Sequence, residues 1–221
     1  MKLSSRLEEI IRWVPSCRCA VDVGTDHALV PIALLSRNVV GRAIGIDKSP
    51  HPLAQAKVNR HNAHLTTNLQ LQCADGLQSV SLDTDAVVIM AGMGGITMQM
   101  VLQQTDWRGT LVIQPNRDQV DTRTFLYEEG WQSDGESLIV ENDQFFWTSR
   151  WRYQPSQKST VSPLGLYFGH QTWMGSGDVF RCWFEREYAR IQSLPEQAPA
   201  REHLRLFTEM QKVLSELTNL S

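Results

Sequence analysis

The chain has 221 residues, of which 42% are hydrophobic and 20% are charged, and its formal net charge at pH 7 is −3. This length and composition are typical of one globular domain of ordinary size with an appendage. The small negative charge argues against a protein that coats nucleic acid through bulk charge. No apolar run reaches the roughly 18 residues that span a bilayer, so we expect a cytoplasmic protein.

Alternating helices and strands are predicted for the first part of the chain. A capping box at Ser5–Glu8 precedes an apolar stripe at helical spacing, and Pro15 ends this helix. Pro31 is tolerated only in the first turn of a helix, which places the start of the next helix near Ala28. The elements expected after the first helix are a strand at 19–24, a helix at 28–38, a strand at 41–47, a helix from Pro50 or Pro52 to about Ala63, and a strand at 69–73.

The alternation continues and then gives way to a hairpin. The run DAVVIMAG (85–92) is nearly all apolar, as expected of a central parallel strand buried on both faces. Asn142-Asp143 lies between two strand-like runs within 136–153, which is a hairpin signal. The other elements expected here are a helix at 96–105, a strand at 110–115 and a helix from 118 that ends before Gly130.

Five βα units followed by an antiparallel hairpin predict an α/β fold. The pattern favours a Rossmann-like sandwich of the methyltransferase kind, with a mostly parallel sheet and an antiparallel last strand, because a dinucleotide-binding sheet more usually stays parallel. We assign this domain to residues 1–155. Residues 156–221 are expected to hold the rest of a polar linker (154–163) and a small helical appendage.

The appendage is expected to be a helical hairpin. The helical pattern runs from about Asp178 to Leu220 and is interrupted between Leu194 and Pro199. Its apolar positions suggest two facing stripes: Phe180, Trp183, Phe184 and Tyr188 on the first helix, and Leu204, Phe207, Met210, Val213, Leu214 and Leu217 on the second.

The four cysteines, Cys17, Cys19, Cys73 and Cys182, are expected to be free thiols. No grouping of cysteine and histidine has the spacing of a zinc site, so we expect no metal.

Polar residues and glycines gather where the predicted strands end. Ligands of such sheets bind at the carboxyl ends of the strands. Each residue alone has a structural explanation as a helix cap, a turn or a close packing point, but their placement after consecutive strands predicts a binding site. The residues are Asp22, Gly24, Asp26 and His27 after the first strand, Asp47 after the second, Asp75 and Gly76 after the third, Gly92, Met93, Gly94 and Gly95 after the fourth, and Gln114, Pro115 and Asn116 after the fifth.

Two acidic positions indicate which cofactor this site takes. Asp47 ends the second strand, where an acid accepts hydrogen bonds from the ribose hydroxyls of NAD or of S-adenosylmethionine (SAM). Asp75 favours SAM, because SAM methyltransferases commonly place an acid after the third strand to hold the adenine amino group.

The first loop also argues against a dinucleotide. A pyrophosphate packs against a glycine-rich helix start, whereas the sequence VDVGTDHALVP has a single glycine and places the negative charge of Asp26 nearby. SAM has no phosphate and carries a sulfonium beside an ammonium, so an aspartate is acceptable there. An NAD-dependent oxidoreductase is therefore disfavoured.

The motifs GTDHALVP, GIDKSPHPL, ADGL, IMAGMGG and LVIQPN, in this order, resemble the bacterial tRNA adenine-N1 methyltransferases that modify adenine 22, the TrmK family. The resemblance covers about residues 1–155. It implies a SAM-binding Rossmann-like domain, tRNA as the partner and a helical C-terminal part that helps to grip the tRNA. Leu29-Val30 replaces a Tyr-Leu pair of the family signature, so any base stacking by that tyrosine is absent here.

The resemblance also implies roles for individual residues. It makes Asp26, His27 and Asn116 the catalytic candidates, with Asp26 facing the methyl-transfer site. Gln114, Pro115 and Asn116 would close the pocket of the target base, while Arg6 and Arg12 would hold phosphates. The set that would line the SAM pocket is Asp22, Gly24, Asp47, Lys48, Asp75, Gly76, Gly92, Met93 and Gly94.

Adenine N1 can attack the SAM methyl group without prior deprotonation, so we expect positioning to supply most of the catalysis. Asp26 would stabilise the cationic ring and accept the N6 proton, after the base has been swung out of the folded tRNA. Two alternatives stay open: a SAM methyltransferase for another base or a small molecule, and a SAM- or RNA-binding protein without chemistry. We expect a monomer, with a dimer as the alternative.

Overall fold

The computed structural model describes residues 2–78, 80–156, 161–169 and 177–218. The chain divides into two compact units, Met1–Ser159 and Thr160–Ser221, each of which is described by itself.

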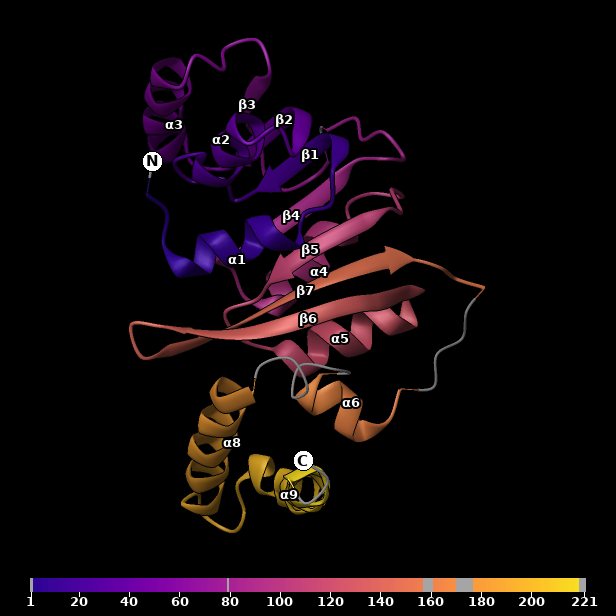
Figure 1. Cartoon of the computed structure of the whole chain (residues 1–221). Helices are drawn as coiled ribbons and strands as arrows, with labels where there is room; N and C mark the ends of the chain where they lie inside the picture. Colours follow the sequence, from indigo (N-terminus) through magenta and orange to yellow (C-terminus); the bar gives the residue numbers. More distant parts are fainter. Residues whose placement is uncertain (1, 79, 157–160, 170–176, 219–221) are drawn as a thin grey trace. The chain divides into compact units, whose positions relative to one another are not determined.

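Seven strands of the described residues form one sheet in the first unit, in the order β3-β2-β1-β4-β5-β7-β6 (Figure 1). Strands β1 to β5 pair in parallel, whereas β7 is antiparallel to both β5 and β6. The predicted α/β fold, mostly parallel with an antiparallel last strand, is confirmed. The strands are β1 (Cys17–Val23), β2 (Val40–Asp47), β3 (Leu69–Cys73), β4 (Val87–Ala91), β5 (Thr110–Gln114), β6 (Trp131–Glu141) and β7 (Gln144–Tyr153).

Helices cover both faces of this sheet, because alternate residues of its central strands point to opposite sides. Ala20 of β1 joins a hydrophobic cluster with α1, α2 and α3, while its neighbours Cys19 and Val21 join a second cluster with α4 and α5. The helices of this unit are α1 (Ser5–Trp13), α2 (Leu29–Ser36), α3 (Pro50–Asn62), α4 (Gly95–Leu102) and α5 (Gln119–Glu128).

The start of β6 and one additional helix differ from the sequence prediction. β6 begins at Trp131 rather than at Glu136, because Trp131 is buried in the second cluster and pairs with Tyr153. A short helix, α6 (Pro163–Phe168), begins where only a linker was expected; its cap is Ser162, whose hydroxyl accepts a hydrogen bond from Gly165 N. Residues 157–160 of the predicted linker lie outside the described residues.

The second unit is built on an aromatic cluster. It contains α6, α8 (Gly177–Gln192), the 3-10 helix η1 (Pro199–His203) and α9 (Leu204–Thr218). Phe207 of α9 lies 5.0 Å from Phe184 and 5.6 Å from Tyr188 of α8, measured between ring centroids, so the expected faces of the two helices do meet. Phe168 of α6, which the sequence analysis did not include, is also fully buried in this cluster.

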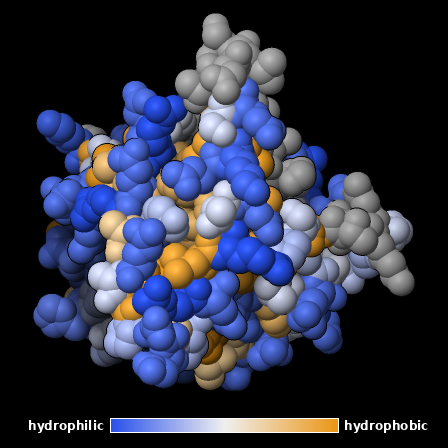
Figure 2. All heavy atoms as spheres, turned by 90° about the horizontal axis from the view of Figure 1, so that it is seen from below, coloured by the Kyte–Doolittle hydropathy of each residue, from blue (hydrophilic) through white to orange (hydrophobic). Residues whose placement is uncertain are grey.

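No helix within the described residues combines the length and the apolar character that crossing a bilayer requires. The face drawn in Figure 2 is mainly hydrophilic, with smaller hydrophobic areas between the polar side chains. Cys17, Cys19, Cys73 and Cys182 are free thiols, as predicted.

Candidate functional site

The loop after β1 is fixed to the end of β2. The backbone N–H groups of Gly24 and Thr25 both donate to the carbonyl oxygen of Ile46 at 2.8 Å. Gly24 has a φ of +77°, and a Cβ added there would lie 2.9 Å from the Cε atom of Met93. Only glycine suits both the backbone conformation and the close approach of the loop after β4.

Asp22 is a buried carboxylate at the centre of this edge. Its side chain accepts a hydrogen bond of 2.7 Å from the hydroxyl of Thr25. Burial raises the pKa of Asp22 to about 6, the Thr25 hydrogen bond lowers it, and the negative charge of Asp47 raises it further. No cation pairs with Asp22 in the part of the chain that the structure describes. A positively charged ligand would therefore compensate its charge.

Asp47 links the loops after β1 and β2. Its Oδ2 atom accepts a hydrogen bond of 3.1 Å from the backbone N–H of Asp26, and its Oδ1 atom accepts one of 2.9 Å from that of Ser49. The residue stays partly exposed, so its carboxylate oxygens have room to accept hydrogen bonds from ribose hydroxyls as well. The neighbouring Lys48 is exposed.

Asp26 and His27 form the exposed tip of the first loop. Asp26 has a φ of 52°, and 67% of its side chain is exposed. His27 Nε2 lies 3.7 Å from Asp26 Oδ1, and the His27 carbonyl accepts a hydrogen bond from Asn59 Nδ2 of α3 at 2.9 Å. Among the described groups, His27 Nδ1 is a buried atom without a hydrogen-bond partner. The aspartate is thus free to face a ligand while the histidine is anchored through its backbone.

The loop after β3 has a glycine with a packing role. Gly76 has a φ of +77°, and a Cβ there would overlap the Gln104 side chain, whose Oε1 atom accepts the backbone N–H of Leu77 at 2.8 Å. Packing therefore accounts for this glycine, and its predicted contact with a cofactor stays a prediction. Asp75 beside it is exposed.

The loops after β4 and β5 are joined by their backbones. Asn116 N donates to Met93 O at 2.9 Å, and Gly95 N donates to Arg117 O at 3.1 Å. A Cβ on Gly95 would overlap the hydroxyl of Thr122, so this glycine lets α4 and α5 approach each other. Asn116 itself is exposed beside the turn of Gly92, Met93 and Gly94.

Gln114, at the end of β5, forms hydrogen bonds with residues of α1 and β7. Its side chain is fully buried; Nε2 donates to Thr148 Oγ1 at 2.7 Å and to Arg6 O at 3.3 Å, while Oε1 accepts from Arg6 Nη1 at 3.4 Å. These bonds occupy the amide, so the structure gives Gln114 a role in holding α1 against β5 and β7. Pro115 is also buried, and its carbonyl accepts a hydrogen bond from Gln119.

The two predicted phosphate-binding arginines differ in their surroundings. Arg6 lies at the carboxyl edge of the sheet beside Gln114, with Nη1 3.8 Å from the position of a Cβ on Gly92. Arg12 is exposed and pairs with Glu9 of its own helix. Arg6 therefore joins the strand-end residues, whereas the described contacts of Arg12 are within α1.

Sequence reasoning missed four residues of this edge: Thr25, Arg117, Asp118 and Phe146. Asp118 has a φ of 63°, and its Oδ2 atom is buried without a hydrogen bond among the described residues, 3.6 Å from the Nε atom of Arg117. Thr25 follows Gly24 in the sequence, and Arg117 and Asp118 follow Asn116, so their positions could have indicated these three residues. Phe146 carried no such signal because it reaches this edge through the pairing of β7 with β5.

The described residues contain no group of three or more histidine, cysteine, aspartate or glutamate side chains that could hold a metal ion. The site instead offers two carboxylates on adjacent strands: Asp22, which is buried and has no cationic partner among the described residues, and Asp47, which is partly exposed. A ligand that combines a positive charge with ribose hydroxyls fits these two groups.

Comparisons with known proteins give a consistent result. Residues 3–148 match a family model described as a methyltransferase domain. The chain is 25% identical over 150 residues to the tRNA (adenine(22)-N(1))-methyltransferase of Bacillus subtilis; the match covers 66% of this chain and 63% of that relative. The chain thus spans less than two thirds of the length of this curated relative.

Two solved structures are similar in fold. A Streptococcus pneumoniae protein in complex with S-adenosyl-L-methionine has a TM-score of 0.84 and 26% identity, covering 94% of this chain and 99% of that chain. The B. subtilis m1A22 tRNA methyltransferase TrmK has a TM-score of 0.78 and 21% identity, covering 97% and 98% of the two chains.

Proposed function

Because the chain belongs to the methyltransferase domain family, we propose that it transfers a methyl group from SAM to N1 of an adenine in tRNA, namely adenine 22. The observation that carries this proposal is the hydrogen bond from Asp26 N to Asp47 Oδ2. It brings the candidate acid of methyl transfer next to the candidate ribose-binding acid, on the edge of the sheet where ligands bind.

The relatives support both halves of the proposal. The B. subtilis relative is named for methylation of adenine 22 in tRNA, and the S. pneumoniae structure contains SAM. We place the reaction in the cytoplasm, where tRNA is found.

The residues present fit SAM. Asp47 would accept hydrogen bonds from the ribose hydroxyls and Asp75 would accept one from the adenine amino group. The buried charge of Asp22 would balance the cationic end of the cofactor. Gly24 has no side chain that would occupy the space over the strand ends, which leaves room there for the cofactor. When bound, SAM supplies a methyl group activated by its positively charged sulfur.

The chain's own residues then position the base and handle its charge. Asn116 donates to or accepts from the N6 or N7 edge of the adenine, which aligns N1 for attack. The Asp26 carboxylate stabilises the positive charge that develops on the ring and accepts the proton from N6. His27, whose Nε2 atom lies 3.7 Å from Asp26 Oδ1, orients this carboxylate.

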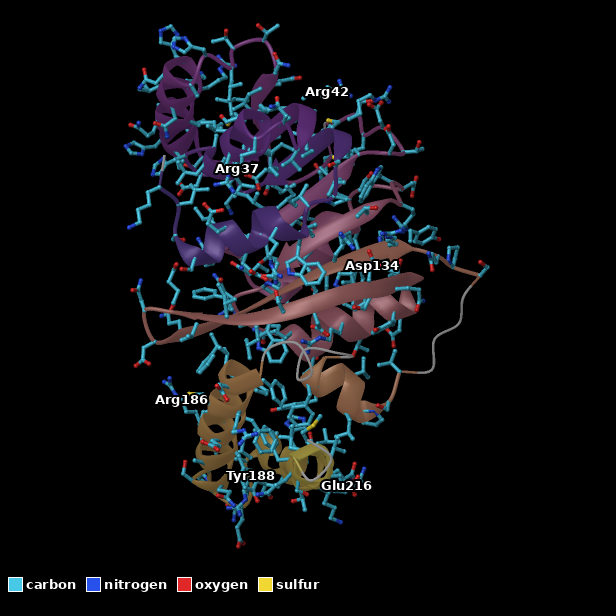
Figure 3. All side chains as sticks on the ribbon, in the orientation of Figure 1. Arg37, Arg42, Asp134, Arg186, Tyr188 and Glu216 are labelled. Atoms are coloured by element: carbon cyan, nitrogen blue, oxygen red, sulfur yellow. The ribbon has the colours of Figure 1, made fainter. Side chains whose placement is uncertain are left out.

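The second unit offers arginines for the tRNA backbone. Arg186 and Arg190 are exposed on α8, on roughly the opposite side of the helix from Tyr188, which packs in the aromatic cluster. Figure 3 labels Arg186 and Tyr188, and Arg190 also pairs with Glu187. We propose that this face of α8 contacts phosphates of the tRNA.

Incubation with tritiated-methyl SAM and bulk unmodified tRNA, followed by nucleoside mapping, tests the function. We expect N1-methyladenosine at position 22. Another methylated base would support the alternative methyltransferase, and SAM binding without any methylation would support a non-catalytic binding protein.

Asp47→Ala is expected to weaken SAM binding by about 1.5–3 kcal/mol, because charge-assisted hydrogen bonds to the ribose are lost. Titration calorimetry without tRNA measures this change. Asp83→Ala is the matched control, since Asp83 is an acid that pairs with Arg42 near the opposite end of β2. Binding of NAD but not of SAM by the wild-type protein would refute the cofactor assignment.

SAM affinity is also expected to depend on pH through Asp22. The pKa of Asp22 is raised to about 6 from an ordinary value of 3.8, so the folded state favours the protonated carboxyl group. Protonated Asp22 therefore adds to the free energy of unfolding below about pH 4, and this stabilisation is lost as the pH rises from about 4 to 6. A cationic cofactor prefers the ionised form, so its Kd should rise by about tenfold between pH 7 and pH 5.

Calorimetry across this pH range is the measurement, with Asp22→Asn as the control. That variant keeps Asp26, His27 and Asp47 and removes only the charge of Asp22. An equally steep pH dependence in Asp22→Asn would assign the effect to another group.

A further inference from the structure

Phe146 occupies a place beside the candidate base pocket that neither hydrophobic cluster explains. It lies on β7, is partly buried, and belongs to neither of the two clusters found among the described residues of the first unit. The guanidinium carbon of Arg6 lies 5.5 Å from the centre of the Phe146 ring. A cation–π contact thus contributes to holding this ring at the edge of the sheet.

The pairing of β5 with β7 fixes where this ring lies. Ile113 is opposite Ser149, and the side chain of Gln114, the last residue of β5, donates from Nε2 to Thr148 Oγ1. Because the two strands are antiparallel, Phe146, near the start of β7, lies toward the end of the sheet at which β5 ends. Since residues two apart share a face of the sheet, Phe146 is on the same side as Thr148.

Arg6 holds the ring in this place. Its backbone N–H donates to Glu141 Oε2 at 3.1 Å, and its Nη1 atom donates to the buried Gln114 at 3.4 Å. The same Nη1 atom lies 3.8 Å from the position of a Cβ on Gly92. The arginine therefore spans the short distance from Phe146 to the open side of the Gly92 turn.

We propose that Phe146, fixed by Arg6, is the aromatic surface on which the target adenine stacks when it enters the site. A base swung out of the tRNA loses its stacking neighbours, and an aromatic side chain replaces them. This inference rests on the proposed function and adds a substrate-binding residue to it.

The test compares Phe146→Leu, which removes the ring, with Phe146→Tyr, which keeps it. Steady-state and single-turnover methylation of an unmodified tRNA transcript are measured, together with SAM affinity and the urea unfolding midpoint. Phe146→Leu should lower kcat/KM for tRNA by about tenfold and leave SAM affinity and the unfolding midpoint nearly unchanged, while Phe146→Tyr should restore the activity. If Phe146→Leu does not fold, Phe146→Met takes its place.

Phe145→Leu is the matched control, because Phe145 is the neighbouring residue on the opposite face of β7. A transcript with 2-aminopurine at the target position adds a direct readout: its fluorescence should be quenched in the wild-type complex and brighter with Phe146→Leu. Equal activity and equal fluorescence of wild type and Phe146→Leu would overturn this inference alone. Failure of the wild-type protein to methylate adenine in tRNA would overturn the proposed function as well.

Discussion

Asp26→Asn is expected to lower the single-turnover rate of tRNA methylation by roughly 10²–10⁴-fold, the loss typical of a positioned acid–base group. The variant keeps the shape of the side chain but neither accepts the N6 proton nor balances the charge of the methylated ring. SAM affinity should change much less, because that charge appears mainly in the transition state. The measurement is single-turnover methylation with saturating SAM and tRNA.

Asparagine is the right replacement because of the backbone at this position. Asp26 has a φ of 52°, in the left-handed region that asparagine adopts more readily than alanine, so the loop and its bond from Asp26 N to Asp47 should survive. Asp143→Asn is the matched control: Asp143 has a φ of 64° and is also exposed, but it lies in the hairpin turn between β6 and β7. A wild-type rate for Asp26→Asn would show that Asp26 only shapes the turn.

Most of the fold was predictable because its elements are encoded locally. The apolar run of β4 and the prolines that bound α1 and open α3 indicate their structures without reference to the rest of the chain. The short helix α6 was missed because its sequence signals, Ser162 and Pro163, are equally typical of a linker. The start of β6 depends on the burial of Trp131, which only the folded sheet determines.

The site was predictable in outline for the same reason. Residues that follow parallel strands must meet at one edge, and the bonds from Asp26 N to Asp47 and from Asn116 N to Met93 O show this meeting. The methyltransferase family predicted from these motifs is confirmed by the family match over residues 3–148. The occupied amide of Gln114 was not predictable, because its partner Arg6 is 108 residues away in the sequence.

The second large effect is expected from the ion pair of Arg123 and Glu136, which fastens α5 to β6. Arg123 Nη2 lies 2.8 Å from Glu136 Oε2, and their side chains are only 6% and 2% exposed. The guanidinium carbon of Arg123 also lies 4.8 Å from the centre of the Trp147 ring. Arg123→Met should therefore lower the free energy of unfolding by about 3–5 kcal/mol, because it removes the guanidinium that compensates the buried charge of Glu136.

Urea denaturation followed by tryptophan fluorescence measures this loss, and a second variant separates its causes. If the cost comes from the buried carboxylate that has lost its arginine, the double variant Arg123→Met with Glu136→Leu should recover much of the lost stability, since apolar pairs commonly replace buried ion pairs without loss. Arg37→Met, which breaks the exposed pair with Glu8 (Arg37 is labelled in Figure 3), should cost far less. Equal stability of the single and double variants would instead assign the effect to lost packing against Trp147. Because α5 begins at Gln119, three residues after Asn116, Arg123→Met should also raise the KM for tRNA more than it raises the Kd for SAM, whose proposed site is around Asp47.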